Sequence, residues 1–412
     1  MCHKEWTPFS PSTRTLLPPS HLPSSIPFEP KTAVILTLRG ADPSLNACIE
    51  GLLNQKYRDF TIFFVVDSPT DPALTVVKKL LKASELPQNP GRKYKIIIAN
   101  EHRETCSLKC NSLVHVISAL DGDFSVIALL DADTQPSPNW LHQLVEPLSD
   151  PHFSATSGLR WYIPERDNFG SLIRMLWNIA AVNQMVFSQI PWGGSLAIRR
   201  DVFQKTDLLT CWSHSLSDDV PLFSVIRALN SHTLVTPSLL MVNHETCGLP
   251  AFYPWVKRQL LMAKLYHPMW ICIVIQAFLL TLPILLALFL SIIGLYLRDF
   301  SLILWNFSAF CLYIFGVLGA FLIMDHNVRA YLRTQGKSIP HQTFRRLIKT
   351  LISIPLTQFV YTLAIFCIFR QKKLKWRGIS YTFTAPYSVR LEKYLPYSAQ
   401  TTPSAHHNTD SI

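Results

Sequence analysis

The chain has 412 residues, which is enough for two or three domains, and 49% of them are hydrophobic while only 16% are charged, an apolar balance for a soluble protein. The net charge of +11 would suit a nucleic-acid-binding protein, but the basic residues crowd beside the longest apolar segments, so we expect a membrane partner and no nucleic acid. The nine cysteines include no Cys-x-x-Cys pair, which argues against a zinc site or a disulfide framework.

Residues 1–30 contain seven prolines and predict a flexible lead-in without a core. They include no apolar run of the kind that a signal peptide requires. We therefore expect the domain that follows to lie in the cytosol.

Residues 31–245 predict one α/β domain. Apolar runs bounded by turn residues predict buried strands at 33–38, 61–66, 94–99 and 126–130. Helices are predicted between them, at 44–55, 72–83 and 106–120. This alternation is typical of a mostly parallel sheet with helices on both faces.

Polar side chains follow three of the predicted strands. Arg39 follows the first, Asp67 and Asp71 the second, and Asp131 and Asp133 the fourth. The carboxyl ends of parallel strands meet at one edge of a sheet, where ligands bind. Asp131 and Asp133 could there hold a divalent cation against a phosphate. Turn chemistry beside two prolines is the alternative for the second pair, and a solvated loop is the alternative for the last pair.

Two polar motifs lie at predicted helix starts. Lys109 and Asn111 could meet the phosphate and base of a nucleotide, although this pattern alone favours a solvated first turn. Asp218 and Asp219 precede an apolar helical run, where Ser217 is a candidate cap and the helix dipole favours one acid. The second acid is then available as a general base.

A glycine turn, Gly193-Gly194, precedes a short apolar strand at about residue 195. Glycines let the backbone approach a ligand closely, and a tight turn for packing explains them equally well.

Three segments, 271–297, 301–324 and 350–369, contain no charged residue, and each is long enough to cross a bilayer of about 30 Å. Residues 246–270 predict an interfacial segment, and residues 371–412 a basic element with a flexible tail. Three crossings would place the basic residues 370–377 outside, against the charge rule. We therefore predict two or three spanning helices within 271–370, with the third segment, which contains Pro355, as the re-entrant or interfacial one.

From residue 32 to residue 381 the chain resembles the membrane-bound, family 2 inverting glycosyltransferases, and most closely ceramide glucosyltransferases. The resemblance implies a GT-A type domain with a mostly parallel sheet, followed by C-terminal transmembrane helices. The motifs that carry it are Thr37–Leu45, Asp67 with Asp71-Pro72-Ala73, Lys109 with Asn111, Asp131-Ala132-Asp133, Asp218-Asp219 and Trp376–Tyr381.

The resemblance implies transfer of a sugar, glucose, from a UDP-glucose-like nucleotide sugar to a lipid hydroxyl such as that of ceramide. Asp219 would be the catalytic base and Asp218 its orienting partner, while Asp131 and Asp133 would hold Mg²⁺ or Mn²⁺. The residues implied for nucleotide-sugar binding are Arg39, Asp67, Asp71, Lys109, Asn111, Asp131 and Arg258. The family often continues its pre-membrane helix with Arg-Trp, whereas this chain has Leu261-Met262 after Arg258. Lys257, Arg258 or Lys264 would have to replace the missing contact to the acceptor or pyrophosphate.

Two other functions are compatible with a membrane-bound α/β chain. A processive polysaccharide synthase would, by resemblance, carry an intact Gln-x-x-Arg-Trp motif and more helices. A non-enzymatic transporter or scaffold would place charged or broken elements inside its membrane segments, and these segments have none beyond prolines and uncharged amides. Nothing in the sequence specifies an oligomeric state.

Overall fold

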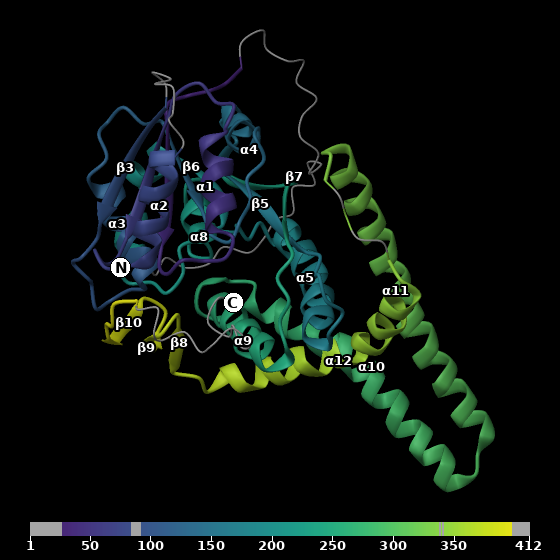
Figure 1. The fold of residues 1–412 in the computed structure, drawn as a ribbon. Helices are drawn as coiled ribbons and strands as arrows, with labels where there is room; N and C mark the ends of the chain where they lie inside the picture. The colour runs from purple at the N-terminus through teal and green to yellow at the C-terminus, as the bar shows by residue number, and fades with distance from the viewer. Residues whose placement is uncertain (1–26, 84–91, 338, 340–341, 398–412) are drawn as a thin grey trace. The chain divides into compact units, whose positions relative to one another are not determined.

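The apolar run Thr32–Leu38 forms β1, whose neighbours β2 (Phe60–Val66) and β4 (Val126–Leu130) are parallel to it. The structure is a computed structural model that describes residues 27–83, 92–337, 339 and 342–397. The chain divides into two compact units (Figure 1). The first combines the residues up to Gly158 with Pro191–Leu239 and Ala385–Tyr397, and the second combines Leu159–Ile190 with Leu240–Thr384.

A seven-stranded sheet organises the first unit, in the order β3-β2-β1-β4-β6-β5-β7. β6 runs antiparallel to both of its neighbours, whereas β3, β2, β1 and β4 are parallel, so the predicted mostly parallel α/β sheet is confirmed. The remaining strands are β3 (Arg92–Ile98), β5 (Phe153–Tyr162), β6 (Ser195–Arg199) and β7 (His232–Asn243).

Helices cover the sheet because both of its faces are apolar. Ile35, Phe63 and Leu129 share one buried cluster with residues of α3 and α8, and Val34 and Leu36, which alternate with Ile35 along β1, are also fully buried. The helices of this unit are α1 (Leu45–Leu53), α2 (Pro72–Ala83), α3 (Leu108–Ser118), α4 (Trp140–Val145), α6 (Arg200–Lys205), α7 (Leu208–Trp212) and α8 (Leu222–Ala228), with a short 3₁₀ turn at Glu146–Ser149.

The second unit is mainly helical. α10, α11 and α12 are long and apolar enough to cross a membrane, which agrees with the three predicted segments. α12 runs unbroken through Pro355, so this proline does not interrupt the third segment. The helices are α5 (Phe169–Ser188), α9 (Leu249–Tyr266), α10 (Trp270–Leu297), α11 (Phe300–Thr334) and α12 (Phe344–Phe369).

The chain after α12 contains strands, where the sequence predicts only a basic element and a flexible tail. β8 (Lys373–Trp376) and β9 (Ile379–Ala385) pair as an antiparallel hairpin. Its turn places Arg377 and Gly378 at φ 45° and 77°, the left-handed conformations that a tight hairpin turn requires. β10 (Ser388–Lys393) follows, and the chain from Ala385 to Tyr397 belongs to the first unit.

Candidate active site

The register of the parallel strands brings together the strand ends that precede the predicted site residues. Leu38 of β1 is opposite Val66 of β2, so Arg39 and Asp67 follow paired positions directly. Leu36 of β1 is opposite Leu130, the last residue of β4, which Asp131 follows. Three sequence-distant polar motifs therefore lie at one edge of the sheet.

Lys109, in the first turn of α3, is the central charge of the site. Its Nζ lies 2.8 Å from Oδ1 of Asp131 and 3.0 Å from Oδ2 of Asp218. The Lys109 side chain is only 16% exposed. The solvated first turn that the sequence pattern favours is therefore wrong for this lysine, because two carboxylates from distant segments enclose it.

Asp219 is fixed by donors of its own. The backbone N–H of Gly193 donates to Oδ2 at 3.0 Å, the N–H of Val220 donates to Oδ1 at 2.8 Å, and the Ser217 hydroxyl also donates to Oδ1. α8 begins at Leu222 after Pro221, so the expectation that Ser217 caps this helix is wrong. Ser217 orients the Asp219 carboxylate instead.

Gly193 explains why a glycine turn stands here. A Cβ at this position would lie 2.3 Å from Oδ2 of Asp218 and 3.1 Å from Nζ of Lys109. The packing of these charged side chains therefore requires a glycine here, which supports the packing interpretation of the turn.

Burial shifts the ionisation of this cluster. Burial raises the pKa of Asp218 from 3.8 to about 6, with the charges of Asp219 and Asp131 adding to the effect and Lys109 opposing it. Burial alone would lower the pKa of Lys109, but the carboxylates of Asp131, Asp218 and Asp219 raise it well above its ordinary value. Lys109 therefore stays positively charged at neutral pH, whereas the pKa of Asp218 lies within about one unit of neutral pH.

Arg39 and Asp67 form a second, neighbouring group. The two side chains are paired through Nη1 and Oδ2, and they are 11% and 4% exposed. Asp71 instead ties the loops together, because its carboxylate accepts the backbone N–H groups of Gly40 at 3.0 Å and Ala73 at 2.8 Å. Burial raises the pKa of Asp71. The turn alternative thus describes Asp71, while Asp67 keeps one carboxylate oxygen, Oδ1, buried without a hydrogen-bond partner among the described residues.

Two other predicted residues have structural partners. The amide of Asn111 accepts the backbone N–H of Arg103 and donates to the carbonyl of Glu101, so it holds that loop in place. Arg258 belongs to the second unit, where its guanidinium lies 4.6 Å from the ring of Trp376.

Asp131 and Asp133 offer carboxylate oxygens of the kind that Mg²⁺ and Mn²⁺ prefer. Asp131 remains 28% exposed although Lys109 pairs with it, so a cation can reach it. Within the described residues, no three His, Cys, Asp or Glu side chains are grouped to hold a metal on their own. The two aspartates could therefore hold a cation only if its other ligands came from a bound molecule and water.

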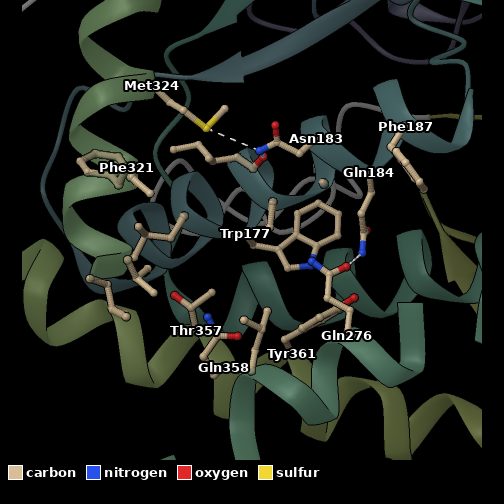
Figure 2. A pocket seen from close by; sticks show the side chains of 18 residues that line it. Trp177, Asn183, Gln184, Phe187, Gln276, Phe321, Met324, Thr357, Gln358 and Tyr361 are labelled. Atoms are coloured by element: carbon tan, nitrogen blue, oxygen red, sulfur yellow. Dashed lines mark hydrogen bonds between the residues drawn. The ribbon is translucent and has the colours of Figure 1, made fainter. Parts of the chain in front are cut away.

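The second unit contains a cavity of about 420 Å³ among α5, α10, α11 and α12. Figure 2 shows Trp177, Phe321 and Tyr361 around it, with the amide of Gln184 directed at that of Gln276. Its wall is mainly apolar, with a few amides that can fix the orientation of a ligand, which is typical of sites for small molecules or lipid chains.

Sequence reasoning missed the aromatic residues of the C-terminal segment. Tyr394 and Tyr397 lie within 5.8 Å of the Arg39 guanidinium, in a stretch that we expected to be a flexible tail. The alternating pattern of Val389 and Leu391 before two tyrosines was the available signal for an ordered strand.

Comparison with known proteins places the chain in a family. The sequence model described as glycosyl transferase family 21 matches residues 12–386. No curated protein matches the chain.

Solved structures that resemble the chain include a mannosyltransferase from Pyrobaculum calidifontis in complex with GDP-Man and Mn²⁺, at 15% identity and a TM-score of 0.41 over 82% of this chain and 88% of that one. Another is glucosyl-3-phosphoglycerate synthase from Mycobacterium tuberculosis in complex with Mn²⁺ and UDP-glucose, at 12% identity and a TM-score of 0.34 over 57% of this chain and 77% of that one.

Proposed function

The chain belongs to glycosyltransferase family 21, the ceramide glucosyltransferase family, and on this premise we propose that it transfers glucose from a UDP-glucose-like donor to a lipid hydroxyl such as that of ceramide, with inversion. The observation that carries the proposal is the ion-paired group of Lys109, Asp131 and Asp218 beside Asp219. This arrangement places a fixed cation and a fixed carboxylate at the ligand-binding edge of the sheet.

On the donor side, the leaving diphosphate gains negative charge as the glycosidic bond breaks. Lys109, held by Asp131 and Asp218, presents a permanent positive charge there without having to reorganise. A divalent cation bound by Asp131 and Asp133 would supply further Lewis-acid stabilisation of the same charge. Arg39 and Asp67 would hold the nucleoside end, which sets the position of the diphosphate relative to Lys109.

On the acceptor side, Asp219 is the proposed general base. Its carboxylate is already oriented by Gly193, Val220 and Ser217, so it can accept the proton of a hydroxyl without first changing its conformation. An acceptor oxygen that approaches opposite the leaving diphosphate displaces it in one step, which inverts the anomeric centre. Asp218 has the positioning role, because it pairs with Lys109 and directly precedes Asp219 in the chain.

The apolar helices and the cavity support a lipid acceptor. A volume of about 420 Å³ lies in the range that holds small ligands, and its apolar wall suits an acyl chain. The helices can deliver a lipid from the bilayer to an enzyme whose catalytic unit we propose to lie on the cytosolic side.

The chain order supports two crossings. Leu239 and Ala385 both belong to the first unit, and the three apolar helices all lie between them. A compact unit occupies one side of a membrane, so an even number of helices crosses. We assign α12 as the helix that does not cross, because both of its ends contact polar residues outside the apolar helices. Arg346 and Lys349 near its start contact Asp167. At its end, the carbonyls of Ile368 and Phe369 accept from Lys264 of α9.

The deciding experiment incubates the purified full-length protein in lipid nanodiscs with labelled UDP-glucose, a divalent cation and ceramide. We expect a labelled glycolipid from the wild type and a loss of at least about a hundredfold in rate from Asp219→Ala. Asp123→Ala is the matched control, because Asp123 is a 73% exposed carboxylate paired with Lys31. Identical lipid products from wild type and Asp219→Ala, across several nucleotide sugars, would refute the proposal.

A further inference from the structure

The C-terminal segment Tyr394–Tyr397 is attached to the nucleoside end of the proposed site. The Tyr394 hydroxyl donates to the backbone carbonyl of Asp67 at 3.2 Å, and Nη2 of Arg39 donates to the carbonyl of Leu395 at 2.7 Å. Just upstream, the N–H of Leu391 donates to the carbonyl of Glu104 at 2.6 Å. Two contacts within the segment and one in the preceding strand therefore bind this part of the chain to the loops that follow the parallel strands.

Aromatic rings form the inner surface of this segment. The ring of Tyr394 stacks on His102, with centroids 3.8 Å apart and planes at 23°. The ring of Tyr397 lies against Gly40, where a Cβ would approach its Cζ to 2.6 Å. Gly40 also has a φ of 77°, so a side chain at this position would be excluded both by the backbone conformation and by the ring.

Asp67, whose backbone carbonyl accepts from Tyr394, has an unused acceptor in its side chain. Oδ1 of Asp67 is buried and has no hydrogen-bond partner among the described residues, whereas Oδ2 is paired with Arg39. The Tyr394 hydroxyl donates to the backbone carbonyl of Asp67, so it leaves Oδ1 unsatisfied. A buried carboxylate oxygen without a donor is unfavourable, and a ligand N–H would relieve that cost.

We propose that Tyr394 and Tyr397 are nucleotide-binding residues that close over the base of the donor, with an N–H of that base donating to Oδ1 of Asp67. This inference rests on the proposed function, in which the donor is a nucleotide sugar. Nucleobases stack on aromatic rings and on arginine, and both are present here, since the Arg39 guanidinium lies 5.8 Å from each tyrosine ring.

Closure of Tyr394–Tyr397 over the base would affect the rates of nucleotide binding and release. The Asp67 side chain is only 4% exposed, so the base can reach its carboxylate only after neighbouring residues move. We assign this movement to Tyr394–Tyr397, which then closes on the bound nucleotide. The segment Tyr394–Tyr397, which follows the apolar helices in the chain, thereby becomes part of the donor site.

The test measures binding of UDP to the full-length protein by calorimetry, and its release by stopped flow. Tyr397→Ala should weaken UDP binding by about tenfold and speed its release. Tyr397→Phe keeps the ring and should bind UDP as the wild type does. Leu395→Ala is the matched control within the segment, because the residue is 47% exposed and its contact with Arg39 is made by its backbone carbonyl.

Inhibition by inorganic pyrophosphate, which has no base, separates base binding from general damage to the site. All variants should respond to pyrophosphate as the wild type does. If UDP binds the wild type and Tyr397→Ala binds it equally well or more tightly, the inference fails and the proposed function stands. If the wild type binds no nucleoside diphosphate, the proposed function itself fails.

Discussion

Nζ of Lys109 lies 3.0 Å from Oδ2 of Asp218, and the two side chains are only 16% and 7% exposed. The residues are 109 positions apart in the chain, and Asp131 completes the group. Removal of one partner of such a buried ion pair strongly destabilises the fold, because the other charge is left without compensation. This pair therefore links the stability of the first unit to the chemistry of the site.

Removal of the central cation should damage both binding and stability. Lys109→Met leaves Asp131 and Asp218 facing each other, so we expect a loss of about 3 kcal/mol in the free energy of unfolding and a large loss of UDP affinity. Chemical denaturation and calorimetry measure the two effects. Lys205→Met is the control, since Lys205 is 62% exposed in its pair with Asp201 and should cost less than about 1 kcal/mol. Equal stability of the two variants would contradict the prediction.

The free energy of unfolding should depend on pH through the ionisation of Asp218. Because burial raises its pKa to about 6, the folded protein holds a proton between about pH 4 and 6 that the unfolded chain has released. The free energy of unfolding therefore falls as the pH rises through this window, by about 3 kcal/mol from this group. Asp218→Asn cannot ionise, so the difference between wild type and variant, measured by denaturation at several pH values, should change across this window. A pH-independent difference would argue against the shift.

Activity should respond to the same group in the opposite direction. Protonation of Asp218 below about pH 6 removes its charge from Lys109, so kcat/KM of the wild type should decline on the acid side of that value. The profile of Asp218→Asn, measured with the same donor and lipid, should lack this acid limb. An identical limb in both proteins would assign it to another group.

The glycine turn should not tolerate a methyl group. Gly193→Ala places a Cβ 2.3 Å from Oδ2 of Asp218, so we expect a loss of roughly 1–3 kcal/mol and a fall in kcat, because the Asp218 carboxylate must shift. Gly122→Ala is the control, since a Cβ there meets no described heavy atom within 4 Å. Steady-state kinetics and thermal melting compare the two. Wild-type kcat in Gly193→Ala would show that the Asp218 position is not critical.

Chelation should test the role of the two aspartates after β4. Removal of divalent cations by EDTA should abolish transfer, and Mg²⁺ or Mn²⁺ should restore it. Asp133→Asn should require at least about tenfold more metal for half-maximal rate, because one ligand has lost its charge. Metal-dependent UDP binding provides a readout that does not require turnover. Full activity in EDTA would exclude this use of Asp131 and Asp133.

Membrane topology can be tested with reporter fusions. Fusions at Gly336, between α11 and α12, and at Thr402, after the last strand, should report the same cytosolic side if α12 does not cross. A fusion at Arg298, between α10 and α11, should report the opposite side and serves as the control. Opposite sides for Gly336 and Thr402 would show that α12 spans the membrane.

The sequence by itself determined the elements whose signals are local. The apolar runs of β1, β2 and β4, the helix Pro72–Ala83 and the three long apolar segments were all predicted close to their observed bounds. Periodicity and length of apolar residues depend only on neighbours along the chain, so they can be recognised without the fold. The order of strand ends also predicted that Arg39, Asp67 and Asp131 share an edge of the sheet.

Only the tertiary structure decided the states of the individual side chains. Lys109 is buried and not solvated because Asp131 and Asp218 reach it from distant segments, and Ser217 orients Asp219 because α8 starts later than its sequence pattern indicates. The docking of Tyr397 on Gly40 joins residues more than 350 positions apart. Burial, ion pairing and pKa depend on contacts that the chain makes only after its topology is complete, and no local pattern specifies them.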